Sequence, residues 1–250
     1  MFGFFKKKKQ QGINETQTDW SFLGTDIHSH FIPGIDDGPA TMSDSLLLLR
    51  EMSDNGFSRL ITTPHISADY FPNTRDKILQ GLEQLREAAT RSQITLPLEA
   101  AAEYMIDEKF MEMLRRKEPL LYFGDRYVLI EMGFIQPSPM LQQAIFELQA
   151  LDYKPVLAHP ERYTYYHRIS LEILTALKDS GCLFQLNTIA FSGYYGKDTR
   201  LFAGKMLQSK LYDFAGSDIH HERHIKAFNS VLRNEQGTAL KNYSFLNNKL

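Results

Sequence analysis

The chain has 250 residues, 43% of them hydrophobic, and a formal net charge of −2 at pH 7. This length and hydrophobic content allow a large core in one or two domains, and the balanced charge excludes a global basic surface for nucleic acid. The single cysteine, Cys182, excludes a disulfide framework within the chain and favours a cytoplasmic location, and no stretch approaches the roughly 20 apolar residues that cross a bilayer.

Residues 1–20 lack hydrophobic periodicity and are predicted to form a flexible leader. It begins with Phe2, Phe4 and Phe5, which precede the lysines at 6–9. One interpretation is a weak membrane contact, in which the aromatic rings insert beside anionic lipid. The other interpretation is a disordered, solvated tail. It is favoured because three aromatic and four basic residues bind a membrane only weakly.

From residue 21 onward, short apolar runs alternate with helical patterns, which is typical of a single α/β domain over residues 21–250. The runs that predict strands are 25–28, 59–63, 96–102, 127–132, 155–159, 183–187 and 212–217. The patterns that predict helices are 43–55, 74–92, 107–117, 138–152, 170–180, 198–210 and 222–234. Asn73 or Thr74 can cap the second helix, and Gly56 and Gly181 are suitable C-terminal stops.

Strands that alternate with helices of this length imply parallel pairing. Seven such repeats favour a distorted (β/α)7 barrel, similar to a TIM barrel, although the order of elements alone leaves an open, doubly wound sheet as the alternative. In barrel enzymes the chemistry lies at the carboxyl ends of the strands. The positions of the acidic and imidazole side chains therefore help to decide between the two folds.

Potential metal ligands end most of the predicted strands. His28 and His30 are two residues apart in an extended segment, so they point to the same side. The other candidates at run ends, or in the loops that follow them, are Asp37, His65, Glu103, Glu131, His159, Asp218 and His220. Imidazole and carboxylate groups suit Zn, Mn, Fe or Mg, and a barrel would bring all of them to one rim.

Each candidate alone has an ordinary structural explanation, such as a hydrogen-bonded histidine at a strand end. Buried carboxylates that follow apolar strands are costly unless they are paired or bind a metal, however, and Glu131 and Asp218 are in that situation. Nine such groups exceed the ligands of one ion, so two or three metal ions are implied, with Glu103 as the candidate bridge. His167 and His224 lack comparable placement, and we expect both to face solvent.

Together these motifs resemble the polymerase-and-histidinol-phosphatase (PHP) superfamily. More closely they resemble its bacterial protein-tyrosine-phosphatase branch, which is encoded with capsule and exopolysaccharide systems. The matching stretches are DIHSH at 26–30, DDGP at 36–39, TPH at 63–65, AE at 102–103, LIE at 129–131, AHPERY at 158–163 and SDIH at 217–220. They span most of the predicted domain.

The resemblance implies a distorted seven-stranded barrel with three metal ions, for which manganese is expected and iron, magnesium and zinc are alternatives. One ion would be held by His28, His30, Glu103 and Asp218, a second by Glu103, Glu131 and His159, and a third by Asp37, His65 and His220. The resemblance also implies two arginines that bind phosphate, one of them Arg162. An arginine after the last metal motif takes the second role, and here it is Arg223.

Metal clusters of this kind activate water and clamp oxyanions, which is the chemistry of phosphoester hydrolysis. We predict single-step hydrolysis by a metal-activated water, with Arg162 neutralising charge and Asp218 or His220 passing a proton to the leaving oxygen. The lack of a Cys-x5-Arg loop argues against a thiol mechanism, since Thr188 stands six residues after Cys182. The aromatic segments 163–166 and 191–195 either wall a pocket for a phosphotyrosine ring or pack as ordinary loops.

By the same resemblance the substrate is a phosphotyrosyl protein, in particular the tyrosine-rich tail of a bacterial tyrosine kinase. A small-molecule phosphatase, such as histidinol-phosphate phosphatase, is the alternative enzyme. A metal-stabilised adaptor that binds the kinase without catalysis is a further alternative, and the intact ligand set argues against it. No nucleic-acid partner is expected, because no basic stripe interleaves with aromatic residues.

Overall fold

The structure, a computed structural model, describes residues 19–250. The leader predicted at residues 1–20, with its membrane contact, therefore lies outside the described residues except for its last two positions. Trp20 belongs to the folded domain, because its side chain is fully buried and its ring stacks 4.1 Å from that of Phe228. Within the described range, no helix combines the length and the apolarity that a bilayer crossing requires.

Each of the seven predicted runs contains a strand, and two further short strands follow the second and third runs. The strands are β1 (Thr25–Asp26), β2 (Arg59–Thr62), β3 (His65–Ile66), β4 (Leu98–Ala100), β5 (Glu103–Met105), β6 (Tyr127–Glu131), β7 (Lys154–Ala158), β8 (Leu183–Asn187) and β9 (Phe214–Gly216). Their carboxyl ends, with the loops that follow, contain nearly all of the candidate ligands.

The seven predicted helices are also present, within a few residues of the expected bounds. They are α1 (Met42–Asp54), α2 (Arg75–Arg91), α3 (Glu108–Arg115), α4 (Leu141–Ala150), α5 (Glu172–Asp179), α6 (Lys197–Gln208) and α7 (Glu222–Val231). Thr74 caps α2 by accepting from the amide of Lys77, as predicted. The sequence patterns missed α8 (Glu235–Lys241), which is too short to display helical periodicity, and the short 3₁₀ helices.

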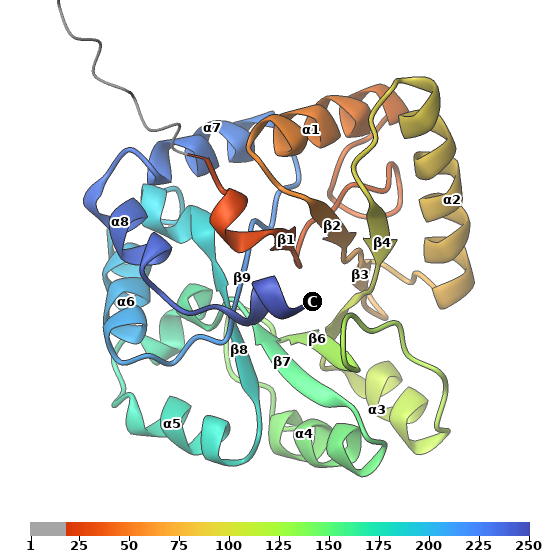
Figure 1. The fold of residues 1–250 in the computed structure, drawn as a ribbon. Helices are drawn as coiled ribbons and strands as arrows, with labels where there is room; N and C mark the ends of the chain where they lie inside the picture. Colours follow the sequence, from red (N-terminus) through yellow and green to blue (C-terminus); the bar gives the residue numbers. More distant parts are fainter. Residues whose placement is uncertain (1–18) are drawn as a thin grey trace, which may run out of the picture.

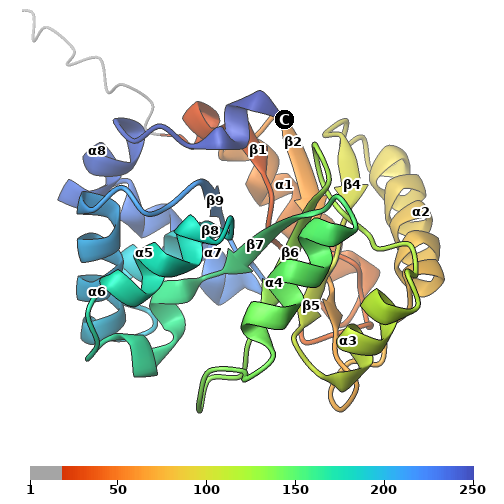
Figure 2. The same cartoon turned by 90° about the horizontal axis from the view of Figure 1, so that it is seen from below.

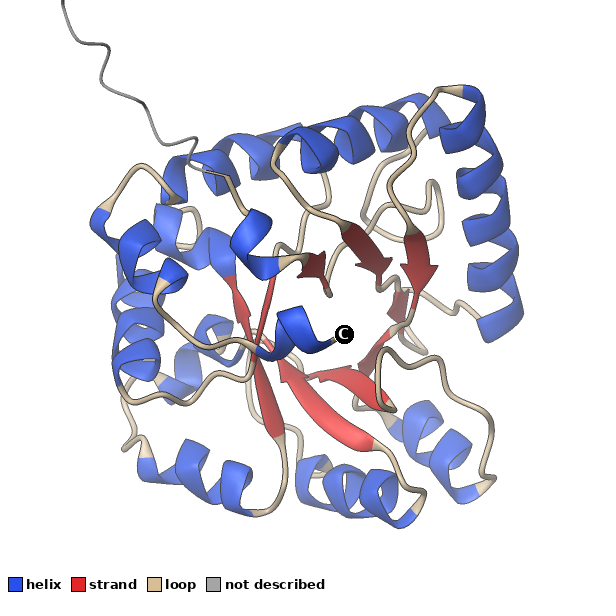
Figure 3. Ribbon diagram, in the orientation of Figure 1, coloured by secondary structure: helices blue, strands red, loops and turns tan. Residues whose placement is uncertain are grey.

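All strand pairs in the described chain are parallel, as the sequence predicts. They form one sheet in the order β1-β2-β4 and a second in the order β3-β5-β6-β7-β8-β9. The strands lie around the middle of the molecule, and the helices lie outside them (Figures 1 and 3). The result is a mixed α/β fold in which a parallel sheet curves into a half-barrel.

The division into two sheets occurs where β2 passes into β3. Pro64 stands between these strands, and proline has no amide hydrogen, so the ladder is interrupted there. Two backbone bonds nevertheless cross the gap, from the amide of Ala101 to the carbonyl of Thr62 at 2.9 Å and from the amide of Glu103 to the carbonyl of Pro64 at 3.1 Å. These bonds keep the two sheets in register where the ligands begin.

The first and last strands adjoin through the segments that follow them. The amide of Asp218 donates to the carbonyl of His28 at 2.7 Å, and Ser29 and Ile219 form an isolated parallel bridge. At the other end of these strands, Asn247 joins them through its side chain, which donates to the carbonyls of Thr25 and Ala215. Figure 1 shows the C-terminal segment lying across the middle of the molecule at this end.

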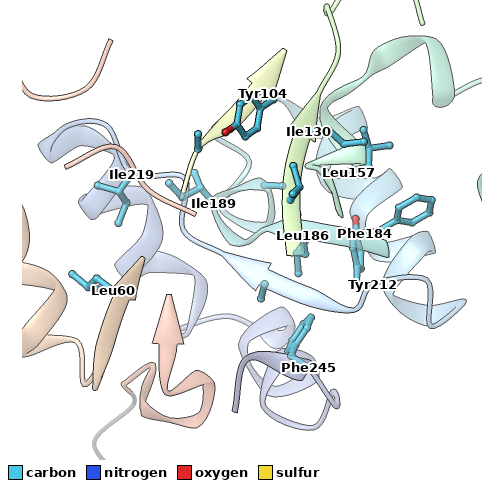
Figure 4. Packing of buried hydrophobic residues seen from close by; sticks show 14 of the residues in the cluster. Leu60, Tyr104, Ile130, Leu157, Phe184, Leu186, Ile189, Tyr212, Ile219 and Phe245 are labelled. Carbon is cyan, nitrogen blue, oxygen red and sulfur yellow. The ribbon is translucent and has the colours of Figure 1, made fainter. Parts of the chain in front are cut away.

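Side chains alternate along the strands between two cores. Leu129 on β6 and Val156 on β7 belong to a small inner core. Ile130 and Leu157 belong to the large core against the helices, and Figure 4 shows both of them in it. The same alternation places Glu131 on the inner side, two residues beyond Leu129 and at the carboxyl end of its strand. The inner core therefore ends in charged groups at one mouth of the sheet.

Candidate metal centre

The candidate ligands from different strands meet at the carboxyl ends of the sheet. Three groups have one ligand atom per residue, all within 4.8 Å of one another. The groups are His28, His30, Glu103 and Asp218; His65, Glu103 and Glu131; and His30, Asp37, His65 and His220. Eight of the nine candidates from the sequence fall in these groups, and the ninth, His159, contacts Glu103.

Glu103 lies at the centre of the cluster, and its side chain is fully buried. Its Oε2 is 3.1 Å from Nε2 of His28 and 3.2 Å from Nδ1 of His65, and its Oε1 is 2.9 Å from Nε2 of His159. The two oxygens thus face imidazoles that come from three different strand ends. This is the placement expected of a carboxylate that is shared between ions.

Asp218 connects the cluster of candidate ligands to the guanidinium group of Arg162. Its Oδ1 is 3.3 Å from Nε2 of His28 and 3.4 Å from Nε2 of His30. Its Oδ2 accepts from Nη1 of Arg162 at 2.6 Å and from Nδ2 of Asn187 at 2.7 Å. One carboxylate therefore faces the imidazoles with one oxygen and the arginine with the other.

Two residues that orient the histidines were not foreseen. Oδ2 of Asp36 lies 2.9 Å from Nδ1 of His30, and Oε1 of Gln185 lies 2.9 Å from Nδ1 of His28. Such partners fix the ring orientation and leave the other nitrogen for a ligand role. The acidic doublet at 36–37 is a signal that could have pointed to Asp36, whereas nothing near Gln185 in the sequence distinguishes it from an ordinary strand residue.

His159 reaches the cluster through an unusual backbone conformation. Val156 and Ala158 face the inner core, so a regular strand would turn the next side chain outward. His159 instead has left-handed dihedrals, with φ 36° and ψ 54°, which a non-glycine residue adopts only at a cost. Asp218, with φ 52°, shares this feature. Strain at two candidate ligands is typical of a functional site.

The charges in the cluster shift one another's ionisation. Burial alone would lower the pKa of His28, but the carboxylates of Glu103 and Asp218 outweigh it and raise that pKa. Burial and the carboxylate of Glu103 both raise the pKa of Glu131. Burial, assisted by Arg162, lowers the pKa of His159 to about 4, so this imidazole is neutral at pH 7, the form that binds metals.

The donor set fits divalent cations. Mixed sets of carboxylate and imidazole ligands bind Mn, Fe, Zn and Mg in proteins. His159 Nδ1 is buried and has no hydrogen-bond partner among residues 19–250, and a buried unpaired nitrogen is costly. A cation or an ordered water in the cavity would relieve that cost.

A cavity of about 280 Å³ opens beside the cluster. Arg162 lies in it between two aromatic rings, with its guanidinium carbon 4.8 Å from the ring centre of Phe134 and 4.4 Å from that of Tyr195. Of the aromatic segments singled out in the sequence, only Tyr195 lines this cavity, while Tyr163 is buried behind it. The sequence analysis did not single out Phe134. This residue lies in the loop before α4, and that loop projects from the molecule in Figure 2.

Arg223 does not line the cavity: it lies exposed on α7 and lines a neighbouring groove, and its role in phosphate binding stays a prediction. One expectation needs correction. His224 does not face solvent, because it is 7% exposed and its Nδ1 accepts from the amide of His220. It lies in the first turn of α7, four residues after His220, and its side chain packs back toward that residue, which helical periodicity in the sequence does not reveal. His167 is half-buried, with Nε2 2.8 Å from the carbonyl oxygen of Glu161.

Residues 24–248 match the profile of the family described as "Capsular polysaccharide synthesis, CpsB/CapC". The chain belongs to the CpsB/CapC family. Among curated relatives, tyrosine-protein phosphatase YwqE of Bacillus subtilis is 28% identical over 86% of each chain. Tyrosine-protein phosphatase CpsB of Streptococcus pneumoniae is 28% identical over 78% of this chain and 82% of the relative.

Solved structures agree with the CpsB/CapC assignment. One of the crystal structures of YwqE from Bacillus subtilis and CpsB from Streptococcus pneumoniae, described as metal-dependent tyrosine phosphatases, has a TM-score of 0.76 and 28% identity over 87% of this chain and 89% of that one. Histidinol phosphate phosphatase from Lactococcus lactis has a TM-score of 0.52 and 14% identity over 88% and 94%. This second likeness concerns the fold alone.

Proposed function

We propose that this CpsB/CapC-family protein is a metal-dependent phosphatase that hydrolyses phosphotyrosine on protein. The observation that carries the proposal is the meeting of eight acidic and imidazole residues in three potential metal sites beside a half-buried, stacked arginine. The names of its relatives, which are tyrosine-protein phosphatases, agree with this activity. The same proposal treats the two sheets as one distorted (β/α)7 barrel with its active site at the carboxyl ends of the strands.

The proposed ligands are the nine residues predicted from the sequence, with two to three divalent cations, manganese first among them. The structure suggests one refinement, that His65 faces Glu131 directly, with Nδ1 2.9 Å from Oε1. His65 is thus a candidate ligand beside Glu131 as well as beside Asp37. Bound cations would supply an activated water and neutralise charge on the phosphoryl group.

The chain's own residues then position the substrate. Arg162 presents a planar fork of donors to phosphate oxygens, and its stacking on Phe134 and Tyr195 fixes the plane of that fork before substrate arrives. Because one donor is held by Asp218, the remaining guanidinium donors are available to the phosphate. Asp218 and His220 both line the cavity and are the candidates for proton transfer to the leaving oxygen.

The aromatic rings at the cavity suit a phosphotyrosine better than a small aliphatic phosphate. Phe134 is 46% exposed and stands at the entrance, where its free face can pack against the substrate ring. We propose the phosphorylated tail of a bacterial tyrosine kinase for capsule or exopolysaccharide synthesis as the physiological substrate.

The test is phosphate release by the purified full-length chain, stripped with a chelator and reloaded with single metals. Phosphotyrosyl peptide, the same peptide with phosphoserine, and histidinol phosphate are compared at equal concentration. We expect release from the phosphotyrosyl peptide only after metal is restored. Preference for histidinol phosphate would favour the small-molecule phosphatase, and tight binding of phosphopeptide by the metal-loaded chain without release would favour the adaptor.

A further inference from the structure

A second depression continues from the candidate active site. It is a groove of about 650 Å³ between α6 and the segment 164–168, and we call it the α6 groove. Tyr195 lines both this groove and the metal cavity, so the two depressions adjoin at that residue. α6 lies at one side of the molecule in Figure 2. A polypeptide whose tyrosine enters the cavity therefore has the α6 groove beside it, within reach of its neighbouring residues.

The α6 groove is cationic. Arg168, Lys197 and Lys205 line it, against the single acidic residue Asp198. All three cations are exposed, and none of them forms an ion pair with another residue of the described range 19–250. Cations that have no partner within the protein keep their full attraction for an anionic ligand.

The spacing on α6 gives the groove a regular wall. Lys197, Leu201 and Lys205 are four residues apart, so they lie in one row along the helix. Leu201 is 54% exposed between the two lysines. The wall therefore offers charge at both ends and an apolar contact in the middle, which suits an extended peptide that carries acidic side chains.

The groove on the other side of the cavity differs. It shares His220 and His221 with the cavity, and its cations Arg223 and Lys226 are balanced by the acidic Asp44 and Glu222. A substrate with negative charge beside its phosphotyrosine gains attraction on the α6 side only. This difference in charge between the two grooves favours binding of the acidic part of the substrate on the α6 side of the cavity.

We propose that the α6 groove binds acidic residues flanking the phosphotyrosine of the substrate, and so selects phosphotyrosyl peptides with carboxylates or a second phosphate close to the reacting one. The proposal rests on the proposed phosphotyrosine phosphatase activity. Exposed ion pairs contribute modestly and are screened by salt, so the expected selectivity is about three- to tenfold in kcat/KM at low ionic strength and falls toward unity near 0.5 M salt.

The test compares two phosphotyrosyl peptides of equal length, one with Asp and Glu flanks and one with Asn and Gln flanks, on the metal-loaded full chain. The variant with Arg168→Gln, Lys197→Gln and Lys205→Gln should lose the preference for the acidic peptide but hydrolyse p-nitrophenyl phosphate normally. The matched control removes three exposed cations elsewhere, by Lys226→Gln, Lys241→Gln and Lys249→Gln, and should keep the preference.

Charge reversal provides a second, independent readout. With Lys197→Glu and Lys205→Glu, the preference should shift to lysine-flanked peptides. Equal turnover of both peptides by the wild-type chain, or an undiminished preference in the triple groove variant, would overturn the inference, while hydrolysis of the phosphotyrosyl peptides would still uphold the proposed function. No hydrolysis of any phosphotyrosine substrate after metal loading would overturn both.

Discussion

Arg162 donates from Nη1 to Oδ2 of Asp218 across 2.6 Å, so the residue expected to bind phosphate is tied to a residue expected to bind metal. Burial would lower the pKa of Arg162, but the carboxylates of Asp218 and its neighbours outweigh burial and raise it. The guanidinium therefore stays charged in a largely enclosed position. It can stabilise negative charge on the phosphoryl group without a rearrangement of the site.

Replacement of this arginine tests that role. We expect Arg162→Gln to lower kcat/KM for phosphotyrosyl peptide about 10²- to 10³-fold, the effect of removing one preorganised donor from a transition state. Arg223→Gln is the matched control, because the structure places Arg223 outside the cavity, and it should cost less than about tenfold. Equal losses in both variants would mean that Arg223 reaches the phosphate in the substrate complex.

His159 offers a test of the metal assignment. His159→Ala removes an imidazole that lies 2.9 Å from Glu103 and is held by a left-handed backbone. We expect loss of p-nitrophenyl phosphate hydrolysis together with a lower metal content, measured by elemental analysis of the purified protein. His167→Gln is the control, since His167 lies outside the cavity. A His159→Ala protein with unchanged metal content and activity would contradict the assignment.

The fold and the ligand positions were largely accessible from the sequence, for a physical reason. Strands buried on both faces are near-continuous apolar runs, so a charged residue such as Glu131 at the end of one is conspicuous. Parallel pairing puts all such ends at one edge, and the motifs therefore predicted which residues would meet. The break between β2 and β3 could not be predicted from the sequence. It depends on which neighbouring strand lies beside Pro64, and only the three-dimensional arrangement shows that.

The orienting residues were less accessible. Gln185 contacts His28 from 157 positions away, and its residue type is ordinary in a strand. Phe134 lies in a loop without periodicity, and its stacking on Arg162 depends on how that loop folds over the cavity. The position of Arg223 outside the cavity was equally hard to predict, because it depends on where α7 begins after a short loop. Side-chain contacts between residues far apart in the sequence could therefore not be predicted from the sequence alone.

The single thiol permits a prediction about mechanism. Cys182 is fully buried, and burial raises its pKa to about 12. The thiolate is the reactive form, so iodoacetamide at pH 8 should leave the folded protein unlabelled and active, whereas the urea-unfolded chain should be alkylated. Mass spectrometry measures the labelling. Cys182→Ala should retain hydrolysis of p-nitrophenyl phosphate, and inactivation of the folded wild type by alkylation would point to a thiol mechanism.

Glu161 predicts how stability depends on pH. Its carboxyl is fully buried, accepts from the amide of Asn187 and the hydroxyl of Tyr212, and has a pKa raised by burial from 4.5 to about 8. Between these values the unfolded chain is ionised while the folded chain holds a proton. This contribution to the free energy of unfolding is therefore complete below pH 4.5 and decreases as pH rises to about 8, by at most about 5 kcal/mol.

Glu161→Gln removes the titration but keeps the shape of the side chain. Both proteins carry every other ionisable group, so the difference between their free energies of unfolding isolates this carboxyl. Urea titrations from pH 5 to pH 9, with metal removed by chelator, should show the wild type losing stability relative to Glu161→Gln as pH rises. A difference that stays constant across that range would mean that Glu161 ionises in the folded protein as readily as in the unfolded chain.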